Sequence, residues 1–318
     1  MKGNQIILGT RGSELALTQT TMVTGLLMQA VDSLAVERKI IQTAGDKRPD
    51  LKFSEFSQGE NPVVDKGIFI KELEIALQGG EIDAAVHSLK DVPSDLEKQF
   101  TIAAVLERAP IEDVLISKSH HTVDSLPPGA RVGTSSVRRA RQLKWLRPDL
   151  EIVELRGNVP TRIRKCLGEG ALDAIMLAAA GLVRLGLMQG DMRTVTIDGQ
   201  SLHAQVLAPT LFYPAAGQGA IAIEARAGDT ETLACLEHLN HAPTAARVTV
   251  EREFLKILGA GCQTPVGAHT WIVGDQLHMS VRVFSETDLQ ARPYEATASG
   301  PVDQPIELAR QLASGLPK

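Results

Sequence analysis

Short apolar segments alternate with amphipathic ones over the first two-thirds of the chain. Residues 6–8, 36–42 and 82–87 are predicted strands, and apolar residues spaced three and four apart predict helices after residue 13 and over 69–77. The same alternation predicts strands at 131–133, 151–155 and 174–177 and helices at 137–146 and 161–167. Strands alternating with helices indicate mostly parallel sheets covered by helices on both faces. Ligands of such sheets bind outside the carboxyl ends of the strands.

The last third of the chain has a different pattern. A helix is predicted over 249–258, followed by antiparallel strands near Trp271, over 277–283 and over 291–298, and a closing helix begins near Glu307. We therefore expect a small α+β domain at this end. Residues 47–65 show no clear period and are expected to form a loop.

The length of 318 residues predicts two or three domains, and a hydrophobic fraction of 43% is enough to build their cores. The three cysteines are too scattered for a disulfide framework, and no residues have zinc-ligand spacing, so no metal is expected. The apolar run at 6–8 is too short for a signal peptide, and the run at 174–183 is too short for a membrane span. A cytoplasmic protein without membrane partners is therefore expected.

The charge of the chain is unevenly distributed. The formal net charge is −5, which argues against a general nucleic-acid binder. Residues 131–165, however, contain eight Arg and two Lys against only three acidic residues, a local excess of +7. Such a concentration of guanidinium groups inside an acidic protein predicts an anion site.

Several cationic residues follow predicted strands and are the candidates for that site. They are Arg11, Lys90, Arg138, Arg139, Arg156, Arg162 and Arg184. Hydroxyl groups that can cap helix N-termini, where anions are favoured, accompany them at Ser13, Thr134, Ser135 and Ser136. For any one arginine, a solvated helix face explains the sequence equally well, and Arg131, Arg141, Arg147 and Arg164 are expected at the surface.

Three further positions could carry chemistry. Asp91 in the segment before Val92-Pro93 is a candidate acid or base, although a turn-forming aspartate fits its position as well, and Asp46 after Gly45 has the same two interpretations. Cys262 lies in a Gly-rich loop and is a candidate nucleophile or attachment point, whereas Cys166 and Cys235 fit buried helical positions. Gln218 lies in a Gly-x-Gly fragment that lacks the dinucleotide fingerprint and suits a crossover between domains.

Seven motifs occur in a recognisable order. They are KGIFIKELE at 66–74, VHSLKDVP at 86–93, VGTSSVRR at 132–139, LRGNV at 155–159, AGLVRLG at 180–186, GQGA at 217–220 and GCQTP at 261–265. Together they closely resemble the hydroxymethylbilane synthase (porphobilinogen deaminase) family of tetrapyrrole biosynthesis, from Gly9 to about Ala268. The segment 188–214 looks longer than in typical members, and we predict no function for it.

The resemblance implies an α/β fold with two periplasmic-binding-protein-like domains, built on mixed, mostly parallel sheets, and a smaller α+β C-terminal domain. The implied boundaries are 1–106 with 219–237 for domain 1, 107–218 for domain 2 and 238–318 for domain 3. The implied transferase joins four porphobilinogen molecules head to tail, with loss of ammonia, into hydroxymethylbilane. A monomer is expected. Before the resemblance is considered, a two-lobed small-anion-binding protein without catalysis explains the same charge pattern.

The resemblance also implies roles for individual residues. Cys262 matches the cysteine that carries a dipyrromethane cofactor through a thioether, and Asp91 matches the catalytic carboxylate, which protonates the leaving amine, stabilises the azafulvenium cation and accepts the pyrrole α proton. The implied residues that bind the cofactor, porphobilinogen and the growing chain are Arg11, Ser13, Asp46, Lys66, Lys90, Thr134, Ser135, Ser136, Arg138, Arg139, Arg156, Arg162, Arg184 and Gln218. With two carboxylates on each pyrrole, such a chain needs many arginines.

Overall fold

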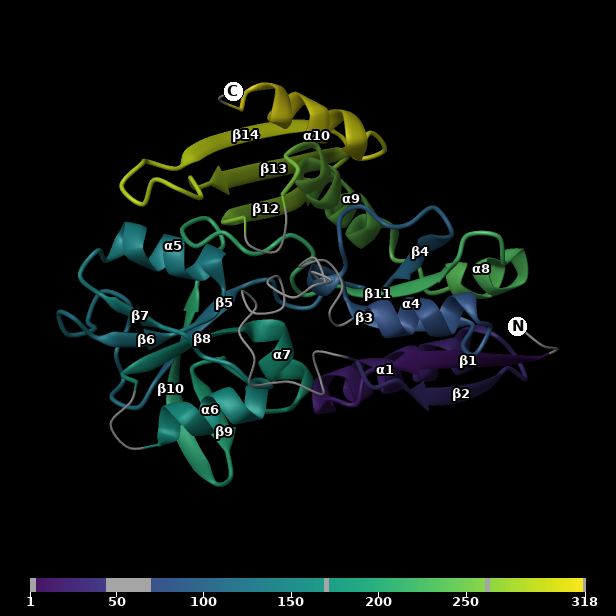
Figure 1. The fold of residues 1–318 in the computed structure, drawn as a ribbon, viewed down its shortest axis with the longest axis horizontal. Coiled ribbons are helices and arrows are strands. Elements are labelled where there is room, and N and C mark those ends of the chain that lie inside the picture. Colours follow the sequence, from purple (N-terminus) through teal and green to yellow (C-terminus); the bar gives the residue numbers. More distant parts are fainter. Residues whose placement is uncertain (1–3, 44–69, 169–171, 261–263, 317–318) are drawn as a thin grey trace, which may run out of the picture.

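Three β-sheets, each with helices packed against it, build the molecule (Figure 1). The structure is a computed structural model, and it describes residues 4–43, 70–168, 172–260 and 264–316. Within these ranges no helix is long and apolar enough to span a bilayer.

The first sheet has five strands in the order β2-β1-β3-β11-β4. They are β1 (Gln5–Thr10), β2 (Ala35–Ile40), β3 (Ala84–Ser88), β4 (Phe100–Val105) and β11 (Ile221–Arg226). Helix α1 (Glu14–Ala30) packs Val23 and Leu27 against one face of this sheet, where α8 (Thr230–Glu237) joins it. Helix α4 (Lys71–Gln78) packs Leu73 and Leu77 against the other face. The sheet is thus covered on both sides, as the alternating sequence predicts.

The second sheet has six strands in the order β7-β6-β8-β5-β10-β9. They are β5 (Asp113–Ser117), β6 (Arg131–Gly133), β7 (Glu151–Val153), β8 (Ala174–Ala178), β9 (Thr194–Ile197) and β10 (Gln200–Leu207). Helix α5 (Val137–Leu146) buries Leu143 on one face, and α6 (Val159–Leu167) buries Ile163 and Cys166 on the other. Helix α7 (Ala179–Arg184) follows β8 directly and contacts α1 of the first sheet.

Parallel pairs do not predominate in these two sheets, which corrects one part of the prediction. The pairs β1–β2, β1–β3, β6–β7 and β6–β8 are parallel. The pairs made by β4, β5, β9, β10 and β11 are antiparallel. The sequence pattern did not predict these five strands. Strand β11 enters the first sheet after the chain returns from the second sheet, and this crossover sets its antiparallel direction. The predicted mixed α/β fold itself is confirmed.

The third sheet belongs to the predicted α+β part. Its strands β12 (Val266–Val273), β13 (Gln276–Val283) and β14 (Tyr294–Pro301) pair antiparallel in chain order. Helices α9 (Ala242–Ile257) and α10 (Pro305–Ser314) bury Phe254 and Leu308 against one face. Helix α9 begins earlier than predicted because the His241 side chain caps it and a proline occupies its first turn.

Two chain crossovers join the first and second sheets. They lie side by side, because the Ala109 amide donates to the Gly219 carbonyl at 3.1 Å and the Arg108 Nε donates to the Gln218 carbonyl at 2.8 Å. Gly219 has a φ of +84°, and a Cβ there would lie 2.5 Å from the Ala109 carbonyl oxygen, so only glycine fits. The crossover interpretation of the Gly-x-Gly fragment is therefore confirmed.

Candidate functional site

Side chains from the carboxyl ends of β1, β3 and β8 gather where the first sheet faces the second. Two adjoining cavities lie there, each with a volume of about 80 Å3. We call them cavity 1, which belongs to the first sheet, and cavity 2, which lies between the sheets. This is the location that the strand-end rule predicts for a ligand.

Cavity 1 contains the candidate catalytic carboxylate. Its lining is formed by Arg11, Ser13, Leu15, Ala16, Gln19, Ile70, Val86, His87, Ser88 and Asp91. Asp91 ends the short 3₁₀ turn Leu89–Asp91 that follows β3, and it is exposed to the solvent of the cavity. Ser13 also caps α1, since its side chain accepts a hydrogen bond from the Ala16 amide. An acid and a guanidinium group therefore share one small cavity.

Cavity 2 is cationic. Among the described residues, four positively charged side chains line it, namely Lys90, Arg139, Arg162 and Arg184. They come from the turn after β3 and from α5, α6 and α7, so both sheets contribute. No acidic side chain is among the described residues that line it. The cavity is suited to a ligand with several carboxylates.

Gln19 borders both cavities and was not among the candidates from the sequence. It is 2% exposed, and it lines both cavities together with Leu15 and Ser88. Gln19 and Ser88 exchange hydrogen bonds of 2.9 and 3.2 Å. The sequence did contain a sign of its role: Gln19 comes three positions after Ala16, so it lies on the face of the predicted helix that packs against the core, where a polar residue is unusual.

Lys90 has a lowered pKa, mainly because of desolvation and then because of its cationic neighbours. Its side chain is open to the solvent of the cleft, but the surrounding protein removes much of the bulk water, and this desolvation lowers its pKa to about 8. Arg139 and Arg138 lower the pKa further, whereas Asp91 and Asp113 oppose them. A carboxylate bound beside Lys90 would relieve this repulsion.

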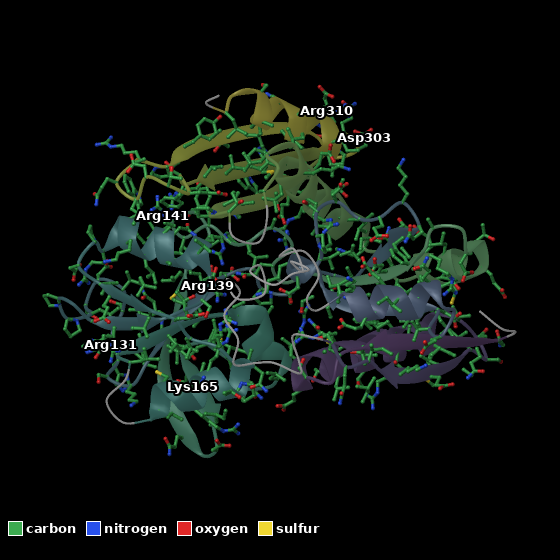
Figure 2. All side chains as sticks on the ribbon, in the orientation of Figure 1. Arg131, Arg139, Arg141, Lys165, Asp303 and Arg310 are labelled. Atoms are coloured by element: carbon green, nitrogen blue, oxygen red, sulfur yellow. The ribbon has the colours of Figure 1, made fainter. Side chains whose placement is uncertain are left out.

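Arg139 forms a buried ion pair with Asp113. Its Nε donates to the Asp113 Oδ1 at 2.8 Å, and its Nη1 donates to the Met176 carbonyl at 3.1 Å. Burial alone would raise the pKa of Asp113, but Arg138 and Arg139 hold it well below its usual range. Burial lowers the pKa of Arg139 more than Asp113 raises it. Figure 2 shows Arg139 toward the centre of the molecule, with Arg131 and Arg141 farther out.

Arg138 lies next to Arg139 in sequence but has a different environment. Its Nη1 donates to the Asp113 Oδ2 and to the Tyr213 carbonyl, both at 2.6 Å. It is 5% exposed and is not among the residues that line either cavity. Its Nε has no hydrogen-bond partner in the described part of the chain.

Arg162 and Arg184 complete the wall of cavity 2. Burial lowers the pKa of each to about 10, and for Arg162 the nearby Arg139 adds to this effect. The Arg162 Nε donates to the Gly157 carbonyl and the Arg184 Nη2 to the Gly219 carbonyl, both at 2.7 Å. The buried Arg184 Nε finds no acceptor among the residues that the structure describes.

The remaining candidates have local roles or lie outside the described residues. Thr134 and Ser136 shape the N-terminus of α5, and the Ser135 hydroxyl donates to the Leu155 carbonyl. Arg156 pairs with Glu154, and Gln218 donates to Asp113 and to the Ile111 carbonyl. None of these five residues lines a cavity. Asp46, Lys66 and Cys262 lie outside the described residues.

The other two cysteines are buried as predicted, whereas the four arginines expected at the surface differ in their exposure. Cys166 and Cys235 are buried and free, and burial raises the pKa of both thiols, that of Cys166 to about 11. No cluster suited to a metal ion occurs among the described residues. Of the four arginines expected at the surface, Arg164 is exposed, whereas Arg131, Arg141 and Arg147 are half-buried. Arg147 donates to the carbonyls of Val123 and Leu126, so it holds local structure and is not a solvated surface residue. None of the four lines a cavity.

Comparisons with known proteins agree with the motifs. The family described as "Porphobilinogen deaminase, dipyromethane cofactor binding domain" matches residues 6–234, and "Porphobilinogen deaminase, C-terminal domain" matches residues 245–318. The porphobilinogen deaminase of Roseiflexus castenholzii is 43% identical over 313 residues, which cover 98% of this chain and 96% of the relative. That of Shouchella clausii is 45% identical over 271 residues, or 85% of this chain and 81% of the relative.

Solved structures give a more distant match. An ancestral cationic amino acid solute binding protein is 12% identical, covers 79% of this chain and 95% of its own, and superimposes with a TM-score of 0.43. Since the family matches extend over nearly the whole length at more than 40% identity, the chain belongs to the porphobilinogen deaminase family.

Proposed function

We propose that the two cavities are the active site of a hydroxymethylbilane synthase and that Asp91 is its catalytic carboxylate. The enzyme joins four porphobilinogen molecules head to tail with release of ammonia. The observation that carries this assignment is the position of Asp91, which lies in cavity 1 beside cavity 2 and its four cationic side chains.

The residues of cavity 2 fit a dipyrromethane cofactor. Each pyrrole of this group carries two carboxylates, and Lys90, Arg139, Arg162 and Arg184 present N–H donors into one small space. The unpartnered, buried Arg184 Nε supports an anionic occupant. When bound, the dipyrromethane supplies the free pyrrole carbon at which porphobilinogen is added. Cys262 is the proposed attachment point, through a thioether.

Asp91 acts on charge and protons at its carboxylate oxygens. The aminomethyl group of porphobilinogen is a stronger base than a carboxylate and already carries its proton, so Asp91 binds it as an ammonium group and the protonation step expected from the sequence is replaced by this ion pair. As the C–N bond breaks and ammonia leaves, the same carboxylate stabilises the azafulvenium cation of the substrate. Asp91 then accepts the pyrrole α proton after coupling and passes it to ammonia, which departs as ammonium.

The cationic side chains bind and orient the carboxylates during these steps. Arg139 is fixed by Asp113, and Arg184 is fixed by the crossover carbonyl of Gly219, so neither has to be ordered when the ligand binds. Arg11 extends this binding role into cavity 1. The proposed binding set has eight further members, some of which act by holding the residues that touch the ligand. They are Asp46, Lys66, Thr134, Ser135, Ser136, Arg138, Arg156 and Gln218.

The proposed domain boundaries follow the three sheets. Residues 1–106 with 219–237 contain the first sheet, residues 107–218 contain the second, and residues 238–318 contain the third, which supports this division. The protein is further proposed to act as a monomer in the cytoplasm, without nucleic-acid or membrane partners. The net charge of −5 supports the exclusion of nucleic acid.

The test combines intact mass with turnover. The purified protein is expected to exceed its sequence mass by two pyrrole units and to convert porphobilinogen into a product that oxidises to a fluorescent porphyrin. Cys262→Ser is expected to lose both the added mass and the activity, while Cys235→Ser, at a buried position far from chemistry in this account, keeps the added mass. An active enzyme whose Cys262 is unmodified would contradict the proposal, and binding without turnover would favour an anion-binding protein.

A further inference from the structure

Helix α9, which packs on the third sheet, also contacts the chain directly after Asp91. The Arg252 side chain donates two hydrogen bonds to that segment, from Nη1 to the Val92 carbonyl at 3.0 Å and from Nη2 to the Pro93 carbonyl at 2.7 Å. Val248, about one helical turn earlier on the same face of α9, belongs to the same buried apolar cluster as Val92. One face of α9 therefore packs against the segment that follows Asp91.

The 3₁₀ turn Leu89–Asp91, here called the Asp91 turn, is held at both ends. Its own hydrogen bond runs from the Val92 amide to the Leu89 carbonyl at 3.0 Å. At its start, the Leu89 amide donates to the Ala220 carbonyl at 3.0 Å, where the crossover enters β11. At its end, Arg252 holds the two carbonyls that follow Asp91. Asp91 thus lies between a start that the crossover fixes and an end that α9 fixes.

The preceding residue of α9 fixes the crossover itself. The Glu251 Oε2 accepts a hydrogen bond from the Gly217 amide at 2.7 Å, and the same carboxylate forms a buried ion pair with Arg108. Gly217 lies against the start of the turn, because a Cβ there would be only 3.1 Å from the Lys90 amide nitrogen. Two consecutive residues of α9, Glu251 and Arg252, therefore hold the two ends of the Asp91 turn.

Arg252 is well suited to hold main-chain carbonyls. It is half-buried, and the loss of bulk water around it lowers the pKa of its guanidinium group to about 10, an effect that Glu224 opposes. It remains a cation near neutral pH, and hydrogen bonds donated by a cation are stronger than those between neutral groups. Its planar group of donors restricts the orientation of both carbonyls, which a single ammonium group does not. Arg252 lines neither cavity, and the steps proposed for Asp91 do not use it.

We infer that Arg252 is a positioning residue, which fixes the chain after Asp91 and thereby the place of the Asp91 carboxylate in cavity 1. The inference rests on the proposed function, in which that carboxylate must face both the leaving ammonia and the azafulvenium cation. Because the Asp91 side chain is exposed, its position depends on the backbone that carries it. A displacement of about 1 Å at a reacting group can lower a rate by about 10²-fold. Loss of Arg252 should therefore weaken catalysis more than substrate binding.

The test is a double-mutant cycle on kcat in cofactor-loaded enzyme, with loading verified by intact mass. Arg252→Gln removes the guanidinium group, and we expect kcat to fall by about 10–100-fold while KM changes by less than about threefold. In the Asp91→Asn background the same substitution should change kcat by less than about threefold, because no carboxylate is left to misplace. Arg252→Lys keeps the charge but not the two parallel donors, so its loss of kcat should be smaller.

Arg226→Gln is the matched control. Arg226 on β11 also donates to two main-chain carbonyls, those of Leu77 and Ile82, at 2.7 Å each. These carbonyls lie in α4 and before the start of β3, whereas the Asp91 turn follows the end of β3. The variant should lower the melting temperature and leave kcat at the wild-type value. It thus separates a loss of stability from a loss of position.

Two results would overturn the inference. One is a folded Arg252→Gln enzyme with the kcat of the wild type, and the other is an equal fall in kcat in the wild-type and Asp91→Asn backgrounds, which would show a general structural role. If Arg252→Gln shows no cooperative thermal transition, Arg252→Lys decides by the same comparison of backgrounds. Failure of the proposed function is recognised separately, because the wild-type holoenzyme would then form no hydroxymethylbilane or Asp91→Asn alone would retain full turnover.

Discussion

Asp113 binds both Arg138 and Arg139, through its Oδ2 at 2.6 Å and its Oδ1 at 2.8 Å. One buried carboxylate therefore serves as the counter-ion of two adjacent guanidinium groups and leaves a net positive charge; of the two, Arg139 lines cavity 2. Because the Arg139 side chain is already fixed, it does not lose conformational freedom when a ligand binds at the cleft.

Asp113→Asn should leave two buried guanidinium groups without their counter-charge. Removing one partner of a buried ion pair costs about 3–5 kcal/mol, so we expect a loss of this size in the free energy of unfolding, measured by denaturant titration. Asp198→Asn, which removes the exposed partner of Arg164, is the control and should leave the unfolding midpoint unchanged. A stability within about 1 kcal/mol of the wild type for Asp113→Asn would contradict this account of the pair.

Lys90 should make substrate binding sensitive to alkaline pH. Desolvation, supported by Arg139, lowers its pKa to about 8, so its positive charge is lost as the pH rises through that value. Carboxylate binding should weaken accordingly, and KM is expected to rise between pH 7.5 and 9, as measured by initial rates. Lys90→Arg keeps its charge over this range, so its KM should rise less. An equal rise in both proteins would show that Lys90 is not the titrating group.

Glu74 should make the folded state less stable as the pH rises. Its pKa of about 7 lies above the value of 4.5 for an unperturbed glutamate, because burial and then Glu224 disfavour its anion. The folded protein therefore retains this proton over a range in which the unfolded chain has lost it, and the associated stability is lost between about pH 4.5 and 7. Glu74→Gln should raise the melting temperature at pH 8 and leave it unchanged below pH 4.5. A variant that melts below the wild type at pH 8 would refute the prediction.

Local signals in the sequence were sufficient for much of the fold. Helix α5 occupies the predicted range Val137–Leu146, since Ser136 caps its start and Pro148 prevents its continuation. Strands β5 and β11 were missed because their partners are distant in sequence: β11 pairs with β3, more than 130 residues earlier, as in the pair of His87 and Ala222. Such pairings leave no local period.

The candidate site was predicted as a set, but the roles within it were not. Consecutive helical residues point in directions about 100° apart, so a sequence that contains both Arg138 and Arg139 does not say which one faces the ligand. Gln19 was missed because a polar residue on a helix is ordinarily exposed, and only its hydrogen bond to Ser88 and its burial show that it borders both cavities. The charge excess of residues 131–165 predicted an anion site, and two residues of that segment, Arg139 and Arg162, are among those that line cavity 2.

The most direct test of the account is the turnover of Asp91→Asn in cofactor-loaded enzyme, with loading verified by intact mass. The amide keeps the size of the carboxylate but can neither stabilise the cation as an anion nor accept the α proton. We expect kcat to fall by about 10²–10³-fold, as for the loss of other groups that stabilise charge in a transition state, while KM changes less. Near wild-type turnover by the loaded Asp91→Asn enzyme would contradict the central claim that Asp91 is the catalytic carboxylate.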